Sequence, residues 1–191
     1  HQLHRRQRQM CIRDRSGALG SRRIKTLSNI NLKPTPEKLR EKLNAWLVKD
    51  VKGANCLDLF CGSGSLGIEA ISNGAKSCTF VEQNPQLFQI LKDNIKALGI
   101  EEQCNLMRTN AETFVRRNKD KNFSLIFFDP PYSRDYYSKF LDRTILNLTQ
   151  KNTVIYIEQS AHDKVIENKR LEMLKTSSTG NAKGTLFLVK P

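Results

Sequence analysis

Short apolar runs alternate along this chain with segments of helical spacing, and that alternation limits the folds it can adopt. Five runs precede helical patterns, at residues 56–60, 78–81, 105–107, 123–128 and 154–157. Consecutive parallel strands need a crossover connection, which is usually a helix. The alternation therefore predicts an α/β fold built on a doubly wound, parallel sheet.

One helix is marked at both ends. Asn84-Pro85 supplies an N-cap with proline at the first helical position, and Gly99 ends the segment. Its apolar residues recur at helical spacing, so that stripe is expected to be core. A second helix is expected between residues 135 and 149, from the spacing of Tyr136, Phe140, Ile145 and Leu148.

Near the C-terminus, residues 171–176 and 185–189 read as two strands joined by the turn-rich residues 177–184. This pattern predicts an antiparallel hairpin that closes the sheet. With 191 residues, the chain is long enough for one domain with a sizeable core.

A glycine-rich turn follows the first apolar run. Gly62, Gly64 and Gly67 fit the dinucleotide-binding fingerprint, and Glu82 stands twenty positions after Gly62, where an acid usually binds ribose hydroxyls. This match does not separate a nicotinamide cofactor from S-adenosylmethionine. Asp58 at the strand end favours the latter, because its carboxylate can bind the ammonium group of a methionine moiety.

The fourth apolar run ends in Asp129-Pro130-Pro131-Tyr132, 71 residues after Asp58. These residues suit methyl transfer to the exocyclic amine of a nucleobase, whose lone pair is delocalised into the ring. Asp129 and the carbonyl of Pro130 can each accept an amine N–H, while Tyr132 stacks on the base. The alternative is an ordinary strand-to-turn junction stiffened by prolines.

The two motifs, in this order, resemble the S-adenosylmethionine-dependent amino-methyltransferases with a DPPY motif. Within that class the chain resembles the small bacterial enzymes that methylate the exocyclic N2 of a guanine in small-subunit (16S) ribosomal RNA. The resemblance extends from about residue 17 to residue 190. It includes residues 32–41, similar to the family's L-R-P-T-x-x-x-V-R-E segment, and residues 67–70, similar to its G-L-E-A.

This resemblance implies a seven-stranded, Rossmann-like methyltransferase fold, mostly parallel, with a C-terminal antiparallel hairpin. It implies S-adenosylmethionine as cofactor, with a ribose-binding acid, an adenine-flanking pair and a catalytic motif. The implied cofactor-binding residues are Asp58, Phe60, Gly62, Gly64, Glu82, Asn110 and Ala111. The implied catalytic residues are Asp129, Pro130, Pro131 and Tyr132. Asn110 is also expected to cap the helix that follows it.

The chain carries a formal net charge of +13, which favours phosphate-rich partners. Basic residues cluster in residues 16–50, ahead of a methyltransferase domain expected over residues 51–191. We interpret the cluster as an RNA-guiding extension; a solvated helix face is the alternative for its helical lysines. The candidate RNA-binding residues are Arg22, Arg23, Lys25, Lys33 and Arg40. The expected partner is ribosomal RNA or a small-subunit assembly intermediate.

Residues 1–15 have no apolar period and do not resemble the family. Part of the segment looks like translated sequencing-adapter read-through, so we interpret it as non-native or disordered; a genuine arginine-rich arm is the alternative. Five arginines and one aspartate give it a charge of +4, so the rest still carries +9 of the total of +13.

The five cysteines form no C-x-x-C pair, which predicts a reduced, cytoplasmic setting and gives no support for a metal site. No apolar run approaches the ~20 residues of a membrane helix. A monomer is expected. Three other functions stay open: an adenine-N6 methyltransferase acting on DNA or RNA, an NAD-binding oxidoreductase, and an inactive RNA-binding module.

Overall fold

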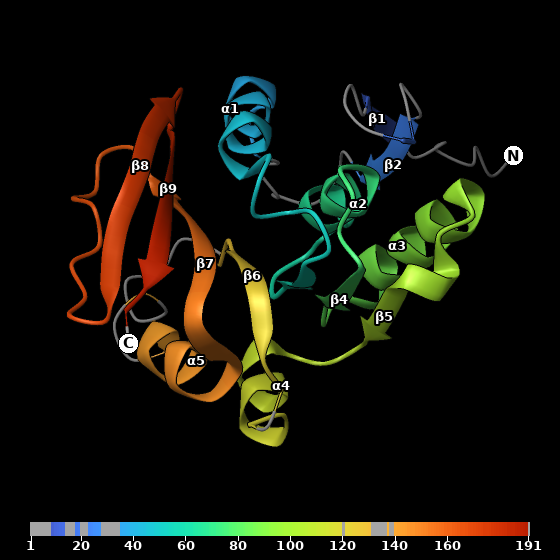
Figure 1. Ribbon diagram of the computed structural model, residues 1–191. Helices are drawn as coiled ribbons and strands as arrows, with labels where there is room; N and C mark the ends of the chain where they lie inside the picture. The colour runs from blue at the N-terminus through green and yellow to red at the C-terminus, as the bar shows by residue number, and fades with distance from the viewer. Residues whose placement is uncertain are drawn as a thin grey trace, which may run out of the picture.

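The computed structural model describes residues 9–13, 18–19, 23–27, 35–119, 121–130, 137 and 140–190. A seven-stranded sheet runs through them in the order β5-β4-β3-β6-β7-β9-β8 (Figure 1). Five strands pair in parallel, and the last two pair antiparallel. The parallel strands are β3 (Asn55–Asp58), β4 (Ser77–Val81), β5 (Cys104–Met107), β6 (Phe123–Phe128) and β7 (Thr149–Ser160). The hairpin is β8 (Leu171–Thr179) and β9 (Ala182–Val189). The predicted sheet is confirmed.

Helices cover both faces of this sheet and bury one core on each. The helices are α1 (Glu37–Leu47), α2 (Ser65–Ser72), α3 (Pro85–Leu98), α4 (Ala111–Arg117) and α5 (Leu141–Leu148), with a short 3₁₀ turn at Glu101–Gln103. One core packs under α1, α2 and α3, and the other under α4 and α5. No helix in the described part of the chain is long and apolar enough to cross a membrane.

The helix caps expected from the sequence are present on α3. The Asn84 side chain accepts the backbone N–H groups of Gln86 at 2.9 Å and Leu87 at 3.2 Å. Gly99 ends the helix with a φ of 68°, a conformation that favours glycine. The helix expected between residues 135 and 149 is α5, and Tyr136 lies outside the described residues.

The C-terminal hairpin is tighter than expected. Its strands continue to Thr179 and Ala182, so only Gly180 and Asn181 remain as the turn, and Gly180 has a φ of 58°. Residues 177–179 are two serines and a threonine, a composition that favours a loop. Their backbones nevertheless pair with β9. Cross-strand pairing therefore overrides turn composition at these positions.

A separate two-stranded ribbon precedes α1. β1 (Gln9–Arg13) pairs antiparallel with β2 (Arg23–Leu27), and Figure 1 shows this ribbon beside α3. The Asn94 side chain of α3 holds β2 by accepting the Lys25 N–H at 2.9 Å and donating to the Lys25 carbonyl at 3.0 Å. Residues 9–13 are thus a paired strand within the segment that we expected to be non-native or disordered.

Candidate active site

Polar residues follow the parallel strands at the edge of the sheet where those strands end. Asp58 ends β3, Glu82 follows β4, Asn110 lies three positions beyond β5, and Asp129 follows β6. Parallel strands end on the same side of a sheet, and ligands of open α/β sheets bind beyond those ends. Asp58, Glu82, Asn110 and Asp129 therefore gather along one edge of the sheet.

The glycine-rich turn after β3 folds in a way that needs glycine. Gly62 has a φ of 55°, and Gly64, the N-cap of α2, has a φ of 86°. A Cβ atom at Gly64 would also collide with the Leu91 side chain. The Glu82 carboxylate accepts the N–H groups of Gly62 at 2.9 Å and Asn84 at 2.7 Å. The acid after β4 thus fixes the turn after β3.

Asp58 is a buried carboxyl at the base of α2. It is only 2 % exposed, and its Oδ2 atom accepts the Gly67 N–H at 3.0 Å. Burial raises the pKa of Asp58 to about 7; the Gly67 N–H lowers it and the charge of Glu82 raises it. A cation beside Asp58 would favour the ionised carboxylate. This carboxyl and the glycine turn fit an S-adenosylmethionine molecule, whose ammonium group is such a cation.

The remaining predicted cofactor residues have structural partners. The Phe60 ring packs edge-on against Phe128, with centroids 5.4 Å apart. Asn110 caps α4, because its side chain accepts the Thr113 N–H at 2.7 Å, as predicted. Ala111 begins that helix and is buried. Contact of these residues with a cofactor stays a prediction.

The proposed catalytic motif is described in part. Asp129 is half-buried directly after β6, and Pro130 is buried. Burial, followed by the charges of Glu158 and Asp58, raises the pKa of Asp129 well above its usual range. Pro131 and Tyr132 lie outside the described residues.

Glu158 is an acid of this region that the sequence analysis missed. It is 1 % exposed on β7, beside the end of β6. A signal was present, because Glu158 follows the apolar run 154–157 just as Asp129 follows the run 123–128. An acid directly after a parallel strand is therefore worth testing as a site residue even when no motif accompanies it.

The candidate RNA-binding residues fall into three groups. Lys25 is exposed on β2, and Arg23 begins that strand; Arg22 and Lys33 lie outside the described residues. Arg40 is instead buried on α1, with its Nη1 atom 3.5 Å from Oε2 of Glu69 on α2. A buried guanidinium needs a charged partner. Arg40 therefore joins α1 to α2, which differs from the expected exposed contact with RNA.

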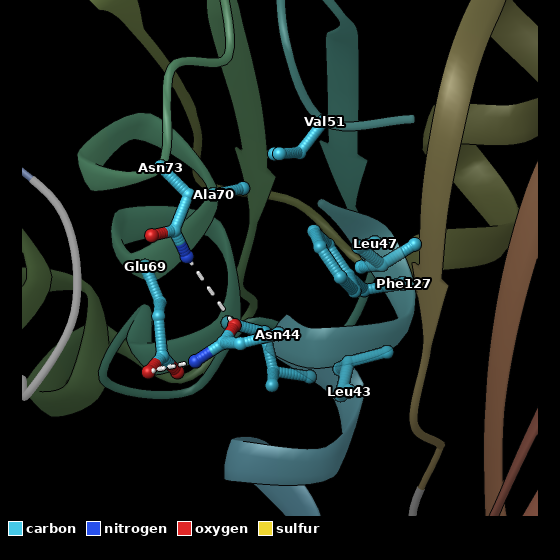
Figure 2. A pocket seen from close by; sticks show the side chains of 9 residues that line it. Leu43, Asn44, Leu47, Val51, Glu69, Ala70, Asn73 and Phe127 are labelled. Carbon is cyan, nitrogen blue, oxygen red and sulfur yellow. Dashed lines mark hydrogen bonds between the residues drawn. The ribbon is translucent and has the colours of Figure 1, made fainter. Parts of the chain in front are cut away.

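The surroundings of Glu69 form a small hollow between α1 and α2 (Figure 2). Asn44 donates to Glu69 at 2.5 Å, and Asn73 donates to Asn44 at 3.3 Å. Apolar side chains complete the lining: Leu43, Leu47, Val51, Leu66, Ala70 and Phe127. None of the lining residues is a predicted cofactor or catalytic residue. The hollow thus belongs to the packing of α1 on α2.

Three cysteines, two in the sheet and one in the turn after β3, are packing residues. Cys56, Cys61 and Cys78 are buried free thiols. Burial raises the pKa of Cys56 to about 12 and the pKa of Cys61 well above its usual value. Because the thiolate is the nucleophile, these thiols are poorly suited to catalysis. Within the described ranges, no group of three or more histidine, cysteine, aspartate or glutamate residues could hold a metal ion.

The amino-acid sequence matches known proteins over most of its length. Residues 12–188 match the family described as conserved hypothetical protein 95. Ribosomal RNA small subunit methyltransferase D of Buchnera aphidicola is 37% identical over 179 residues, which are 91% of this chain and 91% of that protein. The protein of the same name from Haemophilus influenzae is 30% identical over 172 residues, 88% of this chain and 89% of that protein.

Solved structures share the fold. "Putative methyltransferase yhhF" of Escherichia coli superposes with a TM-score of 0.84 at 26% identity, over 95% of this chain and 99% of that one. An RNA methyltransferase of Salinibacter ruber, in complex with S-adenosyl-L-homocysteine, gives a TM-score of 0.65 over 83% of this chain and 94% of that one. At 13% identity, the second likeness concerns the fold alone. The seven-stranded sheet is thus an architecture that methyltransferases use.

Proposed function

The chain belongs to the conserved hypothetical protein 95 family, and we propose that it transfers a methyl group from S-adenosylmethionine to the exocyclic N2 amine of a guanine in small-subunit ribosomal RNA. The observation that carries this proposal is the gathering of Asp58, Glu82 and Asp129 along one edge of the sheet. The names of the relatives support ribosomal RNA of the small subunit as the substrate. Guanine follows from the resemblance of the whole chain to the guanine-N2 enzymes.

The residues after β3, β4 and β5 would hold the cofactor. Asp58 would bind the methionine ammonium group, Glu82 the ribose hydroxyls, and Asn110 with Ala111 would flank the adenine. The backbone of the glycine turn would pass close to the ligand, which the absence of side chains at Gly62 and Gly64 allows. When bound, S-adenosylmethionine supplies an electrophilic methyl group on a sulfonium.

We expect the affinity for S-adenosylhomocysteine to weaken as the pH falls below about 7, the pKa of the buried Asp58. The folded protein without ligand holds a proton on this carboxyl below that pH, and binding the ammonium group requires its release. Where that proton must leave, affinity should drop roughly tenfold for each pH unit. Isothermal titration calorimetry from about pH 5.5 to 8.5 would measure this slope.

Asp58→Asn is the matched control for this titration. It removes the ionisable group of residue 58. It retains any contribution of Glu82 to the pH dependence, because burial also raises the pKa of Glu82. We expect weaker binding with a flatter pH profile in the variant. Equal slopes for the two proteins would show that Asp58 does not bind the ammonium group.

The motif after β6 would activate the guanine amine by positioning it. Asp129 and the Pro130 carbonyl would each accept one N–H, which would pull the nitrogen toward tetrahedral geometry and localise its lone pair, and Pro131 would keep the turn rigid. Tyr132 stacks on the base, an interaction worth about 1–3 kcal/mol. Orientation of this kind can supply roughly 7–11 kcal/mol of a barrier. The nitrogen then loses its proton to Asp129.

The basic N-terminal segment would guide RNA to this edge. Phosphates would contact Arg22, Arg23, Lys25 and Lys33, while an unpaired or flipped guanine enters the site. Asn94 connects β2 to the cofactor turn, because its Nδ2 atom also donates to the Ser63 carbonyl at 3.2 Å. RNA held on β2 would therefore lie near the cofactor turn. The substrate is ribosomal RNA or a small-subunit assembly intermediate.

The nucleoside produced tests the proposed function. The protein is incubated with labelled S-adenosylmethionine and either undermodified small subunits or their naked RNA, and digested nucleosides are separated by chromatography and mass spectrometry. N2-methylguanosine is the expected product, because the motif after β6 is proposed to bind and orient the exocyclic amine of guanine. N6-methyladenosine would overturn the choice of guanine, since an adenine-N6 enzyme would use the same motif. Binding of NAD but not of S-adenosylhomocysteine would overturn methyl transfer altogether.

A further inference from the structure

Glu158 is a buried acid that the proposed mechanism does not use. Strands β6 and β7 are parallel, and their last paired positions are Phe128 and Ile157. Asp129 is the first residue after β6, and Glu158 is the next residue on β7. Neighbouring strands lie about 4.8 Å apart, so the two acids stand level with each other across one strand spacing.

Both acids belong to the same face of the sheet. Phe127 and Tyr156 pair with each other, and both side chains belong to the core under α1, α2 and α3. Side chains alternate between the faces along a strand. The residues two positions later, Asp129 and Glu158, therefore return to that face. The two carboxyls form an adjacent pair.

Contacts from three segments hold Glu158 in place. The Tyr156 hydroxyl donates to its Oε2 atom at 3.0 Å, and the Thr35 side chain also hydrogen-bonds the carboxylate. The Tyr137 hydroxyl donates to the Glu158 backbone carbonyl at 2.8 Å. Donors on a carboxylate favour its ionised form. Burial raises the pKa of Glu158, and its two side-chain partners, Thr35 and Tyr156, lower that pKa by favouring the anion. Glu158 is thus held rigidly by donors that Asp129 does not share.

The charged groups that act on Asp129 within the described chain are both acids: Glu158 on β7 and Asp58 on β3. Asp58 in turn feels the charge of Glu82, after β4. Two carboxyls that share a buried site cannot both ionise easily, and they titrate as a pair. The hydroxyl donors favour the charge on Glu158, which leaves the shared proton on Asp129.

We propose that Glu158 is a positioning residue that controls the protonation of Asp129. This inference rests on the proposed function, in which Asp129 accepts from the guanine amine. Asp129 can accept the amine proton only after its own proton has left. Once the methyl carbon has bonded to nitrogen and its bond to sulfur has broken, which leaves S-adenosylhomocysteine, an N–H bond breaks and an O–H bond forms on Asp129. The proton then passes to solvent from the carboxyl pair. Glu158 therefore sets the lowest pH at which the enzyme works.

Glu158→Gln tests this control, because it removes the charge and retains the shape. Single-turnover methylation of undermodified small-subunit RNA is measured against pH at saturating S-adenosylmethionine. The pH of half-maximal rate on the acid side is expected to fall by about one unit in the variant, since Asp129 loses a facing negative charge. Glu158→Asp, which retains the charge, should stay near the wild-type position.

Glu112→Gln is the matched control, because Glu112 is an exposed acid on α4. It should leave the acid side of the profile unchanged. An unchanged acid side in Glu158→Gln, even with a lower rate, would give Glu158 a structural role only and overturn the inference. Absence of methylation by the wild-type protein would instead overturn the proposed function.

A second measurement needs no variant of Glu158. An acid whose pKa is higher in the folded state destabilises that state increasingly as the pH rises from its unfolded pKa to its folded pKa. The Asp129→Asn variant lacks this acid. Its free energy of unfolding, relative to that of the wild type, should therefore increase as the pH rises. Urea unfolding of both proteins across this interval measures the difference, and a pH-independent difference would contradict the carboxyl pair.

Discussion

Asp129→Asn is expected to remove methyl transfer to RNA and to leave the binding of S-adenosylhomocysteine unchanged. Asparagine has nearly the same shape as aspartate, but its amide is not basic and turns one acceptor into a donor. Removing one preorganised hydrogen-bonding group from an active site typically costs about 10²–10³-fold in rate. Asp129 also accepts the amine proton in the proposed mechanism, so we expect a loss at the upper end. Single-turnover methylation measures the rate, and calorimetry measures ligand affinity.

Asp50→Asn is a suitable control, since Asp50 is an exposed acid in the turn after α1. It should retain both turnover and ligand binding. Undiminished turnover in Asp129→Asn would remove Asp129 from its proposed role. A parallel loss of turnover and ligand affinity would show that Asp129 supports the cofactor turn rather than the target amine.

Local signals explain why so much of the fold was predictable. The cap of α3 depends on Asn84 and its near neighbours, and its end on the conformation of Gly99 alone. The alternation of apolar runs with helices implies parallel strands, and parallel strands place their ends on one edge. Asp58, Glu82 and Asp129 could therefore be expected on one edge of the sheet from their positions after successive strands.

The features that were not predictable depend on contacts between distant segments. Arg40 looked like an exposed cation, but its burial depends on how α1 packs against Glu69 of α2. Glu158 stands level with Asp129 only through the register of β6 on β7, which contains an irregularity between Phe123 and Leu125. Neither the packing of α1 on α2 nor the register of β6 on β7 can be predicted from local composition. The stacking role of Tyr132 stays a prediction.

Gly67→Ala is expected to destabilise the protein, against the usual effect of this substitution. Within a helix, alanine normally stabilises relative to glycine by about 0.5–1 kcal/mol. At Gly67, however, an added Cβ would lie 2.7 Å from Sγ of Cys78 and 2.8 Å from Cζ of Phe80 on β4. Overpacking of this kind typically costs about 1–3 kcal/mol. The displaced α2 would also weaken the bond from the Gly67 N–H to Asp58, and with it the affinity for S-adenosylhomocysteine.

A double-mutant cycle with Phe80→Leu identifies the cause. Leucine removes the ring that meets the new methyl group, so it should recover part of the stability lost in Gly67→Ala. Residues in direct contact show interaction energies of about 0.5–3 kcal/mol, and we expect a stabilising value in this range. Urea unfolding of the wild type, both single variants and the double variant gives that value. Additive losses, or a more stable Gly67→Ala protein, would mean that α2 can move away from β4 at little cost. The close approach of helix and strand would then not be the reason for glycine at this position.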